Sequence, residues 1–344
     1  MTATAVIRRI SAIVPMLNEA DHVEGLVATL DGQDWQGELE VLVADGGSTD
    51  GSVELLRAAA ERVGLELDVL PNPARWVSHG LNACIRAASG DLVVRLDCHS
   101  RYPLDYLRRL AAAAEETGAW NVGGVVIPEG RTEMERAVAC AMDSPFGGIG
   151  WTRHRSTDGR VEVDTVTYGA FRPEAFERAG GFDESLVRNQ DDEFNARLRS
   201  AGGRIVLDPQ IRTYYVPRGS LRGVFKQYYD YGLWKVPVMR KHRRVLSVRS
   251  LAPIGFVGSL ALLGATAPRS ARARRLLAAE VGLYAAGALA AAVASARSRE
   301  EPTTLIPRIA GVFPAFHIGY GLGMIAGWAR ALGTRRPNPS QPAA

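Results

Sequence analysis

Cysteine is scarce in this chain. Its 344 residues include 3 cysteines, Cys84, Cys98 and Cys140, which lie far apart in the sequence. Thiols this few and this scattered exclude a disulfide framework and a cysteine-based zinc site. Because thiols stay reduced in the cytoplasm, we expect these residues to belong to a domain on the cytoplasmic side.

An export signal and sequence repeats are also missing. Arg8 and Arg9 precede an apolar run at residues 11–14, which is shorter than the core of a signal peptide. The stretch rich in proline and alanine lies at residues 337–344, and we expect residues 334–344 to form a disordered tail. The overall composition, 47% hydrophobic and 23% charged, is that of a folded protein.

The excess of positive charge is small and unevenly placed. The net charge is +4, and the basic residues gather in two clusters beside apolar stretches of the last third: Arg240, Lys241, Arg243, Arg244 and Arg249, then Arg269, Arg272, Arg274 and Arg275. A nucleic-acid-binding protein more often spreads such charge over a folded face with interleaved aromatic residues. Basic clusters beside apolar segments instead predict contact with membrane lipids of an anionic inner leaflet and no nucleic-acid partner.

The first part of the chain alternates short β-branched runs with amphipathic helical patterns. Strands are predicted at residues 10–14, 39–44, 65–70, 91–96, 121–127, 163–168 and 205–207, and helices at residues 20–31, 78–88, 102–116, 173–179 and 191–201. A further helix is predicted to run from a cap at Ser48 or Asp50 to Glu61. This alternation predicts a Rossmann-like α/β domain, residues 1–245, with a mostly parallel sheet and flanking helices. We expect residues 129–163 to form a mobile loop near the site.

Three apolar stretches follow, at residues 251–267, 276–296 and 305–329. A membrane-spanning helix needs about 20 mostly apolar residues, which the second and third stretches provide. If the first stretch only lies at the interface, Arg-rich residues 269–275 and the Arg335-Arg336 pair share the cytoplasmic side, as the positive-inside rule requires. We therefore expect C-terminal membrane helices within residues 246–333, with two spans and one interfacial segment. Three spans and a soluble helical bundle are the alternatives.

Polar residues stand at the ends of three predicted strands. Asn18 follows the first strand, Asp45 ends the second and Asp97 ends the fourth. Ligands of open α/β sheets bind beyond the carboxyl ends of the strands, so we expect these side chains to share one site.

Asp45 and its neighbours are suited to a nucleotide. A carboxylate at Asp45 can accept a hydrogen bond from a pyrimidine N–H, and the following Gly46-Gly47 lets a ligand approach the backbone. Pro15, Asn18 and Glu19 follow the neighbouring strand and can reach the base or the ribose. Asp-Gly-Gly-Ser also makes a good turn, so simple turn chemistry is the alternative interpretation.

Four further residues complete a nucleotide-diphosphate site. Asp97 and His99 alternate on an extended segment, so both can face one divalent cation, Mg²⁺ or Mn²⁺, that neutralises a diphosphate. Arg75 can touch the base or a phosphate, and Lys235 can lie over the diphosphate. A site without metal and ordinary surface roles for Arg75 and Lys235 are the alternatives.

An acidic run opens one of the predicted helices. Asp191 and Asp192 lie in the first turn, where carboxylates can simply compensate the helix dipole. In a nucleotide-sugar site, one of them can instead take the proton of an acceptor hydroxyl as general base. Crowding of like charges would raise its pKa toward neutrality.

Together these segments resemble glycosyltransferase family 2, which has the GT-A fold, and more narrowly its succinoglycan-type, ExoA-like glucosyltransferases. The resemblance covers residues 10–240 and is carried by the runs Val14-Pro15-Met16-Leu17-Asn18-Glu19, Asp45-Gly46-Gly47-Ser48-Thr49-Asp50, Asn72-Pro73-Ala74-Arg75, Arg95-Leu96-Asp97-Cys98-His99 and Arg188-Asn189-Gln190-Asp191-Asp192-Glu193. It implies transfer of a sugar, with glucose favoured, from a UDP-sugar with inversion. By the same resemblance Asp45 binds uracil, Asp97 binds ribose or metal, and Asp191 is the base.

Two departures from the family pattern affect the site. Gln190 replaces the usual first acid of the pair, and His99 replaces the second aspartate of the common Asp-x-Asp. A third concerns chain elongation, since Gln227 is not followed by the Arg-Trp of processive synthases. Transfer of a single sugar to a lipid-linked acceptor, such as a polyprenyl-linked saccharide of cell-surface polysaccharide or glycolipid synthesis, is therefore the favoured function.

Three other functions are weighed against this one. A processive synthase would need a larger membrane part, and a sugar nucleotidyltransferase would carry a glycine-rich, basic phosphate loop where Met16-Leu17-Asn18-Glu19 stands. An inactive membrane scaffold is disfavoured by the intact acidic set. We expect the enzyme at the inner membrane with its catalytic domain in the cytoplasm.

Overall fold

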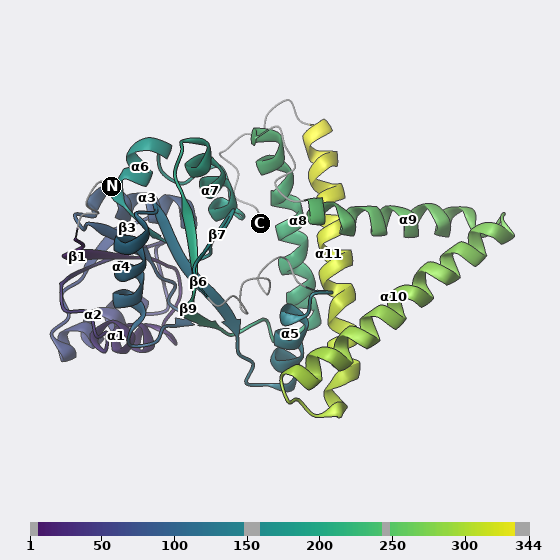
Figure 1. The fold of residues 1–344 in the computed structure, drawn as a ribbon, viewed down its shortest axis with the longest axis horizontal. Coiled ribbons are helices and arrows are strands. Elements are labelled where there is room, and N and C mark those ends of the chain that lie inside the picture. Colours follow the sequence, from purple (N-terminus) through teal and green to yellow (C-terminus); the bar gives the residue numbers. More distant parts are fainter. Residues whose placement is uncertain (1–5, 148–158, 243–247, 334–344) are drawn as a thin grey trace. The chain divides into compact units, whose positions relative to one another are not determined.

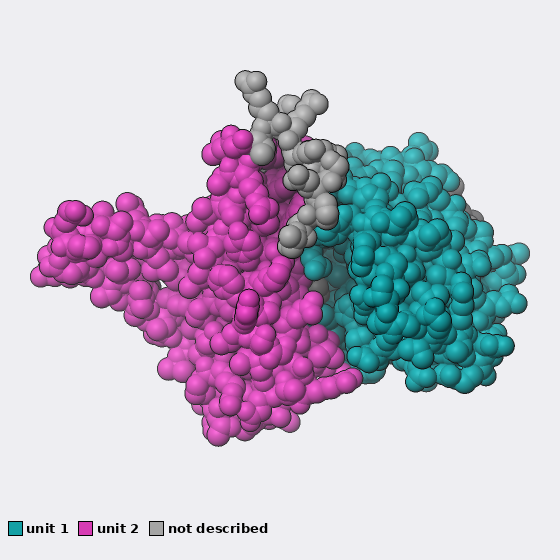
Figure 2. Space-filling model, turned by 180° about the vertical axis from the view of Figure 1, so that it is seen from behind, with its two compact units in different colours: residues 1–127, 154–215 teal, residues 128–153, 216–344 magenta. Residues whose placement is uncertain are grey.

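The computed structural model describes residues 6–147, 159–242 and 248–333. The chain divides into two compact units, the first of residues 1–127 and 154–215 and the second of residues 128–153 and 216–344 (Figure 2). The expected domain boundary near residue 245 falls inside the second unit. The predicted tail at residues 334–344 lies outside the described residues.

The first unit is built on one mixed sheet, which counts nine strands among the described residues. Its parallel part has the order β3-β2-β1-β4 and comprises β1 (Arg9–Met16), β2 (Glu38–Asp45), β3 (Asp68–Pro71) and β4 (Leu92–Arg95). The path continues through strands β8 (Ala170–Phe171), β6 (Asn121–Pro128), β9 (Ile205–Tyr215) and β5 (Ser100–Arg101), with β7 (Val161–Glu162) on β9. The predicted α/β sheet is confirmed in its parallel part, whereas β8 joins β4 and β6 in antiparallel pairs.

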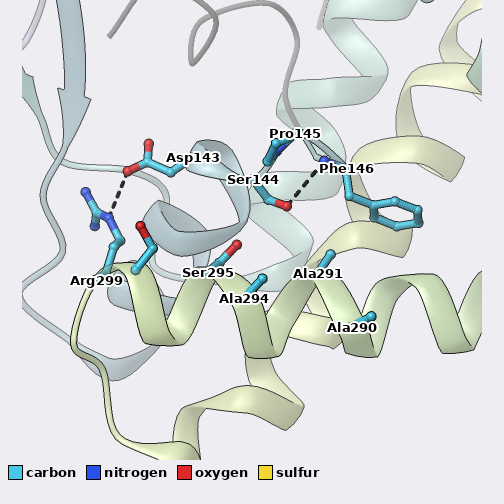
Figure 3. A pocket seen from close by; sticks show the side chains of 10 residues that line it. Asp143, Ser144, Pro145, Phe146, Ala290, Ala291, Ala294, Ser295 and Arg299 are labelled. Atoms are coloured by element: carbon cyan, nitrogen blue, oxygen red, sulfur yellow. Dashed lines mark hydrogen bonds and ion pairs between the residues drawn. The ribbon is translucent and has the colours of Figure 1, made fainter. Parts of the chain in front are cut away.

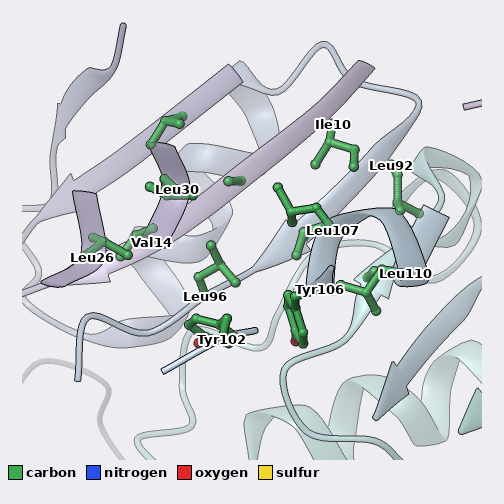
Figure 4. Close-up of a cluster of buried hydrophobic side chains, with 14 of the residues drawn as sticks. Ile10, Val14, Leu26, Leu30, Leu92, Leu96, Tyr102, Tyr106, Leu107 and Leu110 are labelled. Carbon is green, nitrogen blue, oxygen red and sulfur yellow. The ribbon is translucent and has the colours of Figure 1, made fainter. Parts of the chain in front are cut away.

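Helices cover both faces of this sheet, as the alternation of side chains along β1 requires. Ile10, Ala12 and Val14 point into a core with α1 (Val23–Asp31), α2 (Ser52–Val63) and α4 (Tyr106–Thr117), part of which Figure 4 shows. Ile13 points to the opposite core, which includes residues of α3 (Val77–Ala87), α6 (Pro173–Ala179) and α7 (Gln190–Ser200). The result is a three-layer arrangement, and the carboxyl ends of the parallel strands remain available for a site.

In the first unit, one predicted strand is wrong and one predicted helix has a different cap residue. Residues 163–168 do not form a strand, because the side-chain amide of Asn195 bonds to Val166 O at 3.2 Å and Thr165 Oγ1 at 2.8 Å where a strand ladder was expected. The cap of α2 is Gly51 in the left-handed conformation (φ 86°) and makes no side-chain cap bond. Ser48 belongs to the turn that precedes the helix, whereas the Asp50 carboxylate accepts a hydrogen bond from the first helical N–H, that of Ser52, at 3.1 Å.

The loop predicted at residues 129–163 is also wrong in part. It contains helix α5 (Glu133–Asp143), which begins with a capping box between Thr132 and Glu135. The glycine content drew the prediction toward a loop, although the Thr-x-x-Glu spacing is a helix-start signal. Residues 148–158 of that stretch lie outside the described part of the chain.

The second unit is helical. It contains α5, α8 (Leu221–His242), the short helices η2 (Val248–Leu251) and η3 (Thr303–Leu305), and α9 (Ala252–Thr266), α10 (Ala271–Ser298) and α11 (Ile306–Gly333). Helices α8 and α11 run side by side, and α9 and α10 form a hairpin that extends away from them (Figure 1). Ion pairs join α5 to the α10–α11 region: Arg299–Asp143, Arg136–Glu301 and Arg308–Glu133.

Glycines bring the backbones of α8 and α11 into contact. A Cβ added at Gly323 would lie 2.0 Å from Tyr229 O, and one at Gly319 would lie 2.8 Å from Phe225 O. These glycines are one turn apart, which is the spacing that lets two helices approach closely. Because α8 packs on α11 so tightly, the two helices form one structural element.

By length and composition alone, the described part of the chain has two helices that could cross a membrane. They are Ala271–Ser298, whose apolar window is 11% buried, and Thr303–Gly333, whose window is 56% buried. Helix α9 is shorter and apolar. The expectation of two possible spans and one shorter segment agrees with these lengths.

Candidate active site

The loops after β1 and β2 are joined by hydrogen bonds. The backbone N–H of Asn18 donates to Ser48 Oγ at 2.8 Å, and the N–H of Thr49 donates to Asn18 Oδ1 at 2.9 Å. The N–H of Glu19 donates to Ser52 Oγ at 2.8 Å. Asn18 adopts a left-handed conformation with φ 54°, which asparagine tolerates better than most residues. The structure therefore brings Asn18 and Glu19 together with the turn that follows Asp45, and Pro15 pairs with Ala44 just before it.

Asp45 holds its own turn together. Its carboxylate accepts hydrogen bonds from Gly47 N at 3.0 Å, Ser48 N at 3.1 Å and Ser48 Oγ at 2.6 Å. The Asp-Gly-Gly-Ser sequence therefore forms a turn that the Asp45 side chain stabilises. A carboxylate oxygen has more than one lone pair, so these bonds leave acceptor capacity for a base N–H. The role of Asp45 in donor binding stays a prediction.

Arg75 lies beside the same turn. A Cβ added at Gly46 would lie 3.3 Å from Leu17 Cδ1 and 3.5 Å from Arg75 Cα, so Gly46 sits between the ends of two strand loops. The backbone N–H of Asn72 donates to Asp45 O at 2.8 Å and attaches the Arg75 loop to β2. Arg75 itself is exposed, with φ 64°. Its side chain is available to a ligand at this edge.

Glu19 connects two histidines. One carboxylate oxygen lies 2.8 Å from His22 Nδ1, and the other lies 3.2 Å from His99 Nδ1. The two imidazole rings have centroids 6.0 Å apart. The contact with Glu19 therefore orients the ring of His99.

Arg95 and Asp191 are the most strongly linked charged pair at the site. Asp191 stands in the first turn of α7, and its Oδ1 accepts a hydrogen bond from Arg95 Nη1 at 2.5 Å. Arg95 is the last residue of β4, and its Nη2 lies 3.5 Å from Asp97 Oδ1. The ring of Tyr168 packs on the guanidinium at 5.6 Å, and Tyr102 Oη accepts from Asp97 N at 2.8 Å. The structure thus places Asp97 and Asp191 around one cation.

The pKa of Asp191 is raised above its ordinary value. Burial of the carboxyl is the main cause, the guanidinium of Arg95 opposes it, and the negative charges of Asp97 and Asp192 add to it. A buried carboxylate with a raised pKa binds a proton more readily than an exposed aspartate does. This is the property expected of a general base, and it favours Asp191 for that role.

The three consecutive acids of α7 have different surroundings. Asp191 faces Arg95, whereas Glu193 is fully buried and forms an ion pair with Arg197 at 2.8 Å. Arg197 also donates to Gly181 O at 2.7 Å, so the Glu193–Arg197 pair fastens α7 to the preceding loop. Asp192 is half-buried. Glu193 is therefore structural, and Asp191 and Asp192 are the two acids of this helix that are not committed to an internal ion pair with Arg197.

Helix α3 holds the loop that leads into α7. Ser78 Oγ donates to Leu186 O at 2.9 Å, and Asn82 exchanges two hydrogen bonds with the backbone of Phe182. His79 Nε2 lies 3.4 Å from the Glu184 carboxylate. These contacts hold the loop that precedes Asp191, and the contact of His79 with Glu184 contributes to holding it.

The expected alternation of Asp97 and His99 on an extended segment is wrong, because residues 97–100 form a turn in which the Ser100 N–H donates to Asp97 O at 3.3 Å. Asp97 offers the oxygen ligand that a hard divalent cation prefers, and the imidazole nitrogen of His99 is a softer ligand. Among the residues that the structure describes, no group of three or more His, Cys, Asp or Glu side chains is arranged to hold a metal ion. Asp97 and His99 side chains are 15% and 42% exposed, so both can be reached from solvent. Two protein ligands fit a cation that takes its other ligands from substrate phosphates, as Mg²⁺ commonly does.

Lys235 lies in the second unit, on α8, where its side chain is buried. Its contact with a diphosphate stays a prediction.

The second unit also holds a cavity of about 440 Å³ between the end of α5 and α10 (Figure 3). Small residues such as Ala290 and Ala294 line one side, and the Arg299–Asp143 ion pair closes one end. Of the described residues that line this cavity, none belongs to the predicted site.

Arg95 is a site residue that the sequence motifs did not predict. The signal was present, because Arg95 interrupts the apolar run Leu92-Val93-Val94-Arg95-Leu96 of a buried strand. A charge in such a place is rarely tolerated unless it is paired. The pairing partner could not be identified, since Asp191 is 96 residues away in the sequence.

Comparisons with known proteins find relatives that cover most of the chain. The sequence model of glycosyl transferase family 2 matches residues 11–178. The chain is 32% identical over 333 residues to the succinoglycan biosynthesis protein ExoA of Rhizobium meliloti (strain 1021), covering 94% of this chain and 95% of that protein. It is 25% identical over 256 residues to a dolichyl N-acetyl-alpha-D-glucosaminyl phosphate 3-beta-D-2,3-diacetamido-2,3-dideoxy-beta-D-glucuronosyltransferase of Methanococcus voltae, covering 72% and 78%.

A solved structure shares the fold. The mannosyltransferase PcManGT from Pyrobaculum calidifontis, in complex with GDP-Man and Mn²⁺, superposes with a TM-score of 0.66 at 23% identity. The match covers 94% of this chain and 88% of that chain. The GT-A fold expected from the sequence motifs is confirmed.

Proposed function

Because the chain belongs to glycosyltransferase family 2, we propose that it moves a single sugar, with inversion, from a UDP-sugar to a lipid-linked saccharide acceptor. Glucose is the favoured donor sugar. The observation that carries the proposal is the partly buried Asp191 carboxylate with a raised pKa, held by Arg95 beside Asp97. A base and a donor-side carboxylate are thereby joined in one site.

The reaction is a direct displacement at the anomeric carbon. The acceptor hydroxyl oxygen forms the new bond to that carbon while the bond from the carbon to the diphosphate oxygen breaks. The electron pair of the broken bond leaves with UDP, and the hydroxyl proton passes to Asp191. General base catalysis of this kind typically contributes about 10²–10⁴-fold to the rate.

The donor is held by the loops at the strand ends. Asp45 would accept from the uracil N–H, Pro15, Asn18 and Glu19 would line the base and ribose, and Arg75 would reach the base or a phosphate. The support is the hydrogen-bonded contact among these loops. Lys235 is proposed to lie over the diphosphate.

A divalent cation, Mg²⁺ or Mn²⁺, is proposed to bind with the donor. Asp97 and His99 would hold it, and when bound it would neutralise charge on the departing diphosphate. The exposed imidazole of His99 is oriented by Glu19 at 3.2 Å, which leaves its ring in a defined position. A ring held in this way is better prepared to bind a cation than a freely rotating one.

The acceptor is proposed to be a polyprenyl-linked saccharide used in cell-surface polysaccharide or glycolipid synthesis. The support comes from the names of relatives, since the Methanococcus voltae protein is named for a dolichyl-linked substrate and others for undecaprenyl phosphate. The exposed apolar surface of α10 supports attachment to a membrane. We propose a location at the inner membrane with the catalytic unit in the cytoplasm.

The test is a comparison of Asp191→Asn with Asp192→Asn. UDP release from a panel of UDP-sugars is measured with and without a synthetic polyprenyl-diphosphate-linked saccharide. We expect Asp191→Asn to lower the rate about 10²–10⁴-fold while calorimetric UDP binding changes little. Substantial activity in Asp191→Asn, with loss in Asp192→Asn, would move the base to Asp192. Activity in both variants would refute the mechanism.

A further inference from the structure

Arg95 is a buried arginine that serves two carboxylates. Its side chain is 7% exposed, and it contacts Asp191 through Nη1 at 2.5 Å and approaches Asp97 through Nη2 at 3.5 Å. The guanidinium is planar, so these two nitrogens project from it in fixed directions. The rigid guanidinium therefore fixes the position of Asp191 relative to Asp97.

Stability does not explain this arrangement. Removing charged groups from water costs several kcal/mol per ion, about as much as their attraction returns. Here one cation faces two anions, and the Nε of Arg95 is buried without a hydrogen-bond partner among the described residues. A buried polar group without a partner carries a further cost. An arginine kept in such a place at the active site points to a role in the reaction.

The geometry also assigns the two oxygens of Asp191. Oδ1 accepts the hydrogen bond from Arg95. No described residue donates a hydrogen bond to Oδ2, and the side chain is 24% exposed, so that oxygen can accept from the acceptor hydroxyl. Phe194, one turn further along α7, is fully buried and holds the helix on its core side. The carboxylate is therefore fixed both through its helix and through one oxygen.

We propose that Arg95 is a positioning residue for the transfer step. It holds Asp191 through Oδ1 so that Oδ2 receives the acceptor proton, and it fixes that carboxylate relative to Asp97. The inference rests on the proposed function, since it needs Asp191 to be the base. Loss of the bridge leaves Asp191 free to turn, and small errors in the placement of a reacting group cost about 10²-fold in rate.

The experiment compares Arg95→Lys and Arg95→Met with wild type. We measure kcat and KM for the UDP-sugar that gives the highest rate, calorimetric UDP binding and the thermal unfolding midpoint. We expect kcat to fall about 100-fold in Arg95→Met, with KM and the UDP dissociation constant within about threefold of wild type. Arg95→Lys should recover only part of kcat, because an ammonium is a point charge and cannot hold two carboxylates in one plane.

Arg160→Lys is the matched control. Arg160 also connects two carboxylates of the first unit, Asp208 at 2.7 Å and Glu116, away from the predicted site residues. Its substitution should leave kcat unchanged, and any fall of its unfolding midpoint should be smaller than that of Arg95→Lys, because Arg160 is 29% exposed and Arg95 is 7% exposed. The inference is overturned if Arg95→Lys keeps full kcat, or if the loss appears in KM and UDP binding. If Arg95→Met fails to fold, the result for Arg95→Lys decides the inference. Activity in Asp191→Asn would refute the assignment of Asp191 as the base, and with it the proposed function as well as this inference.

Discussion

At the scale of single residues, the pKa of Asp191 connects neighbouring charges to the pH dependence of the reaction. Burial raises this pKa most, Arg95 lowers it, and Asp97 raises it. Asp192 adds a smaller increase by like-charge repulsion. A general base works only when ionised, so the rate falls as pH drops through the pKa of the folded enzyme. The acidic limb of the rate profile should therefore lie above the pH at which an ordinary aspartate titrates, about 3.9.

Asp192→Asn should move that limb to lower pH. The substitution removes a negative charge near Asp191, which makes the ionised form of Asp191 easier to reach. Near pH 8, where the base is already ionised, kcat should change little. The measurement is kcat against pH for both proteins with one donor and acceptor. An unchanged limb, or one displaced to higher pH, would contradict the assignment of Asp191 as the titrating base.

The sequence predicted the site residues that stand at strand ends better than those that depend on tertiary pairing. Asn18, Asp45 and Asp97 were placed by strand and turn patterns, and the structure puts them at the ends of β1, β2 and β4 as expected. The Arg95–Asp191 bond joins elements 96 residues apart, and periodicity carries no information about such a pair. For the same reason the contact of His99 with Glu19 was not predicted.

At the scale of secondary-structure elements, the helices of the first unit and the parallel strands were predicted because each satisfies a local pattern, whereas helix α8 of the second unit was not predicted. The short strands β5, β7 and β8 have two residues each, which is too few for any alternation to be visible. Residues 163–168 carry a strand-like sequence, but the backbone carbonyl of Val166 accepts its hydrogen bond from the Asn195 side chain. A tertiary hydrogen bond thus overrides the strand propensity of these residues.

The contact between α8 and α11 makes a prediction at this scale. Gly323→Ala should destabilise the second unit, because the added Cβ would meet Tyr229 O at 2.0 Å and the helices would have to separate. Overpacking of this kind costs about 1–3 kcal/mol. Gly311→Ala on the same helix is the control, since a Cβ there meets nothing within 4 Å. That substitution should be neutral or stabilising by up to about 1 kcal/mol, because alanine favours a helix.

Thermal unfolding in detergent measures both variants. We expect the midpoint to fall for Gly323→Ala and to stay or rise for Gly311→Ala. Equal midpoints would mean that α8 and α11 are not packed backbone to backbone. A fall of similar size in both variants would mean that any added methyl on α11 is harmful, and the glycine contact would lose its special role.

At the scale of the whole molecule, each unit is built from two separate stretches of the sequence. The second unit takes residues 128–153 from the middle of the sequence as well as residues 216–344. Its core contains Val138 of α5 and Tyr228 of α8, and the ring of Tyr228 stacks on Phe316 of α11 at 4.0 Å. The C-terminal helices are therefore part of a folded unit and more than an anchor attached to a finished domain.

This organisation changes the expected result of a truncation after residue 245. A domain that ended there would remain soluble and bind UDP if the C-terminal helices were only an anchor. In the structure, the truncation removes the partner of α8 and uncovers Val224, Tyr228 and Val236, which are buried. It also removes the cationic partners of Asp143 and Glu133 on α5. We expect the shortened protein to aggregate, because a large apolar face would be left in water.

Size-exclusion chromatography and calorimetric UDP binding in detergent test this expectation, with a chain ending at residue 333 as control. The control keeps α11 complete and should match the full-length protein in both measurements. The truncation after residue 245 should elute as aggregate even in detergent, because α5 and α8 lose specific partners and not only a lipid contact. A monodisperse truncated protein with wild-type UDP affinity would show that the first unit folds without the helices that complete the second.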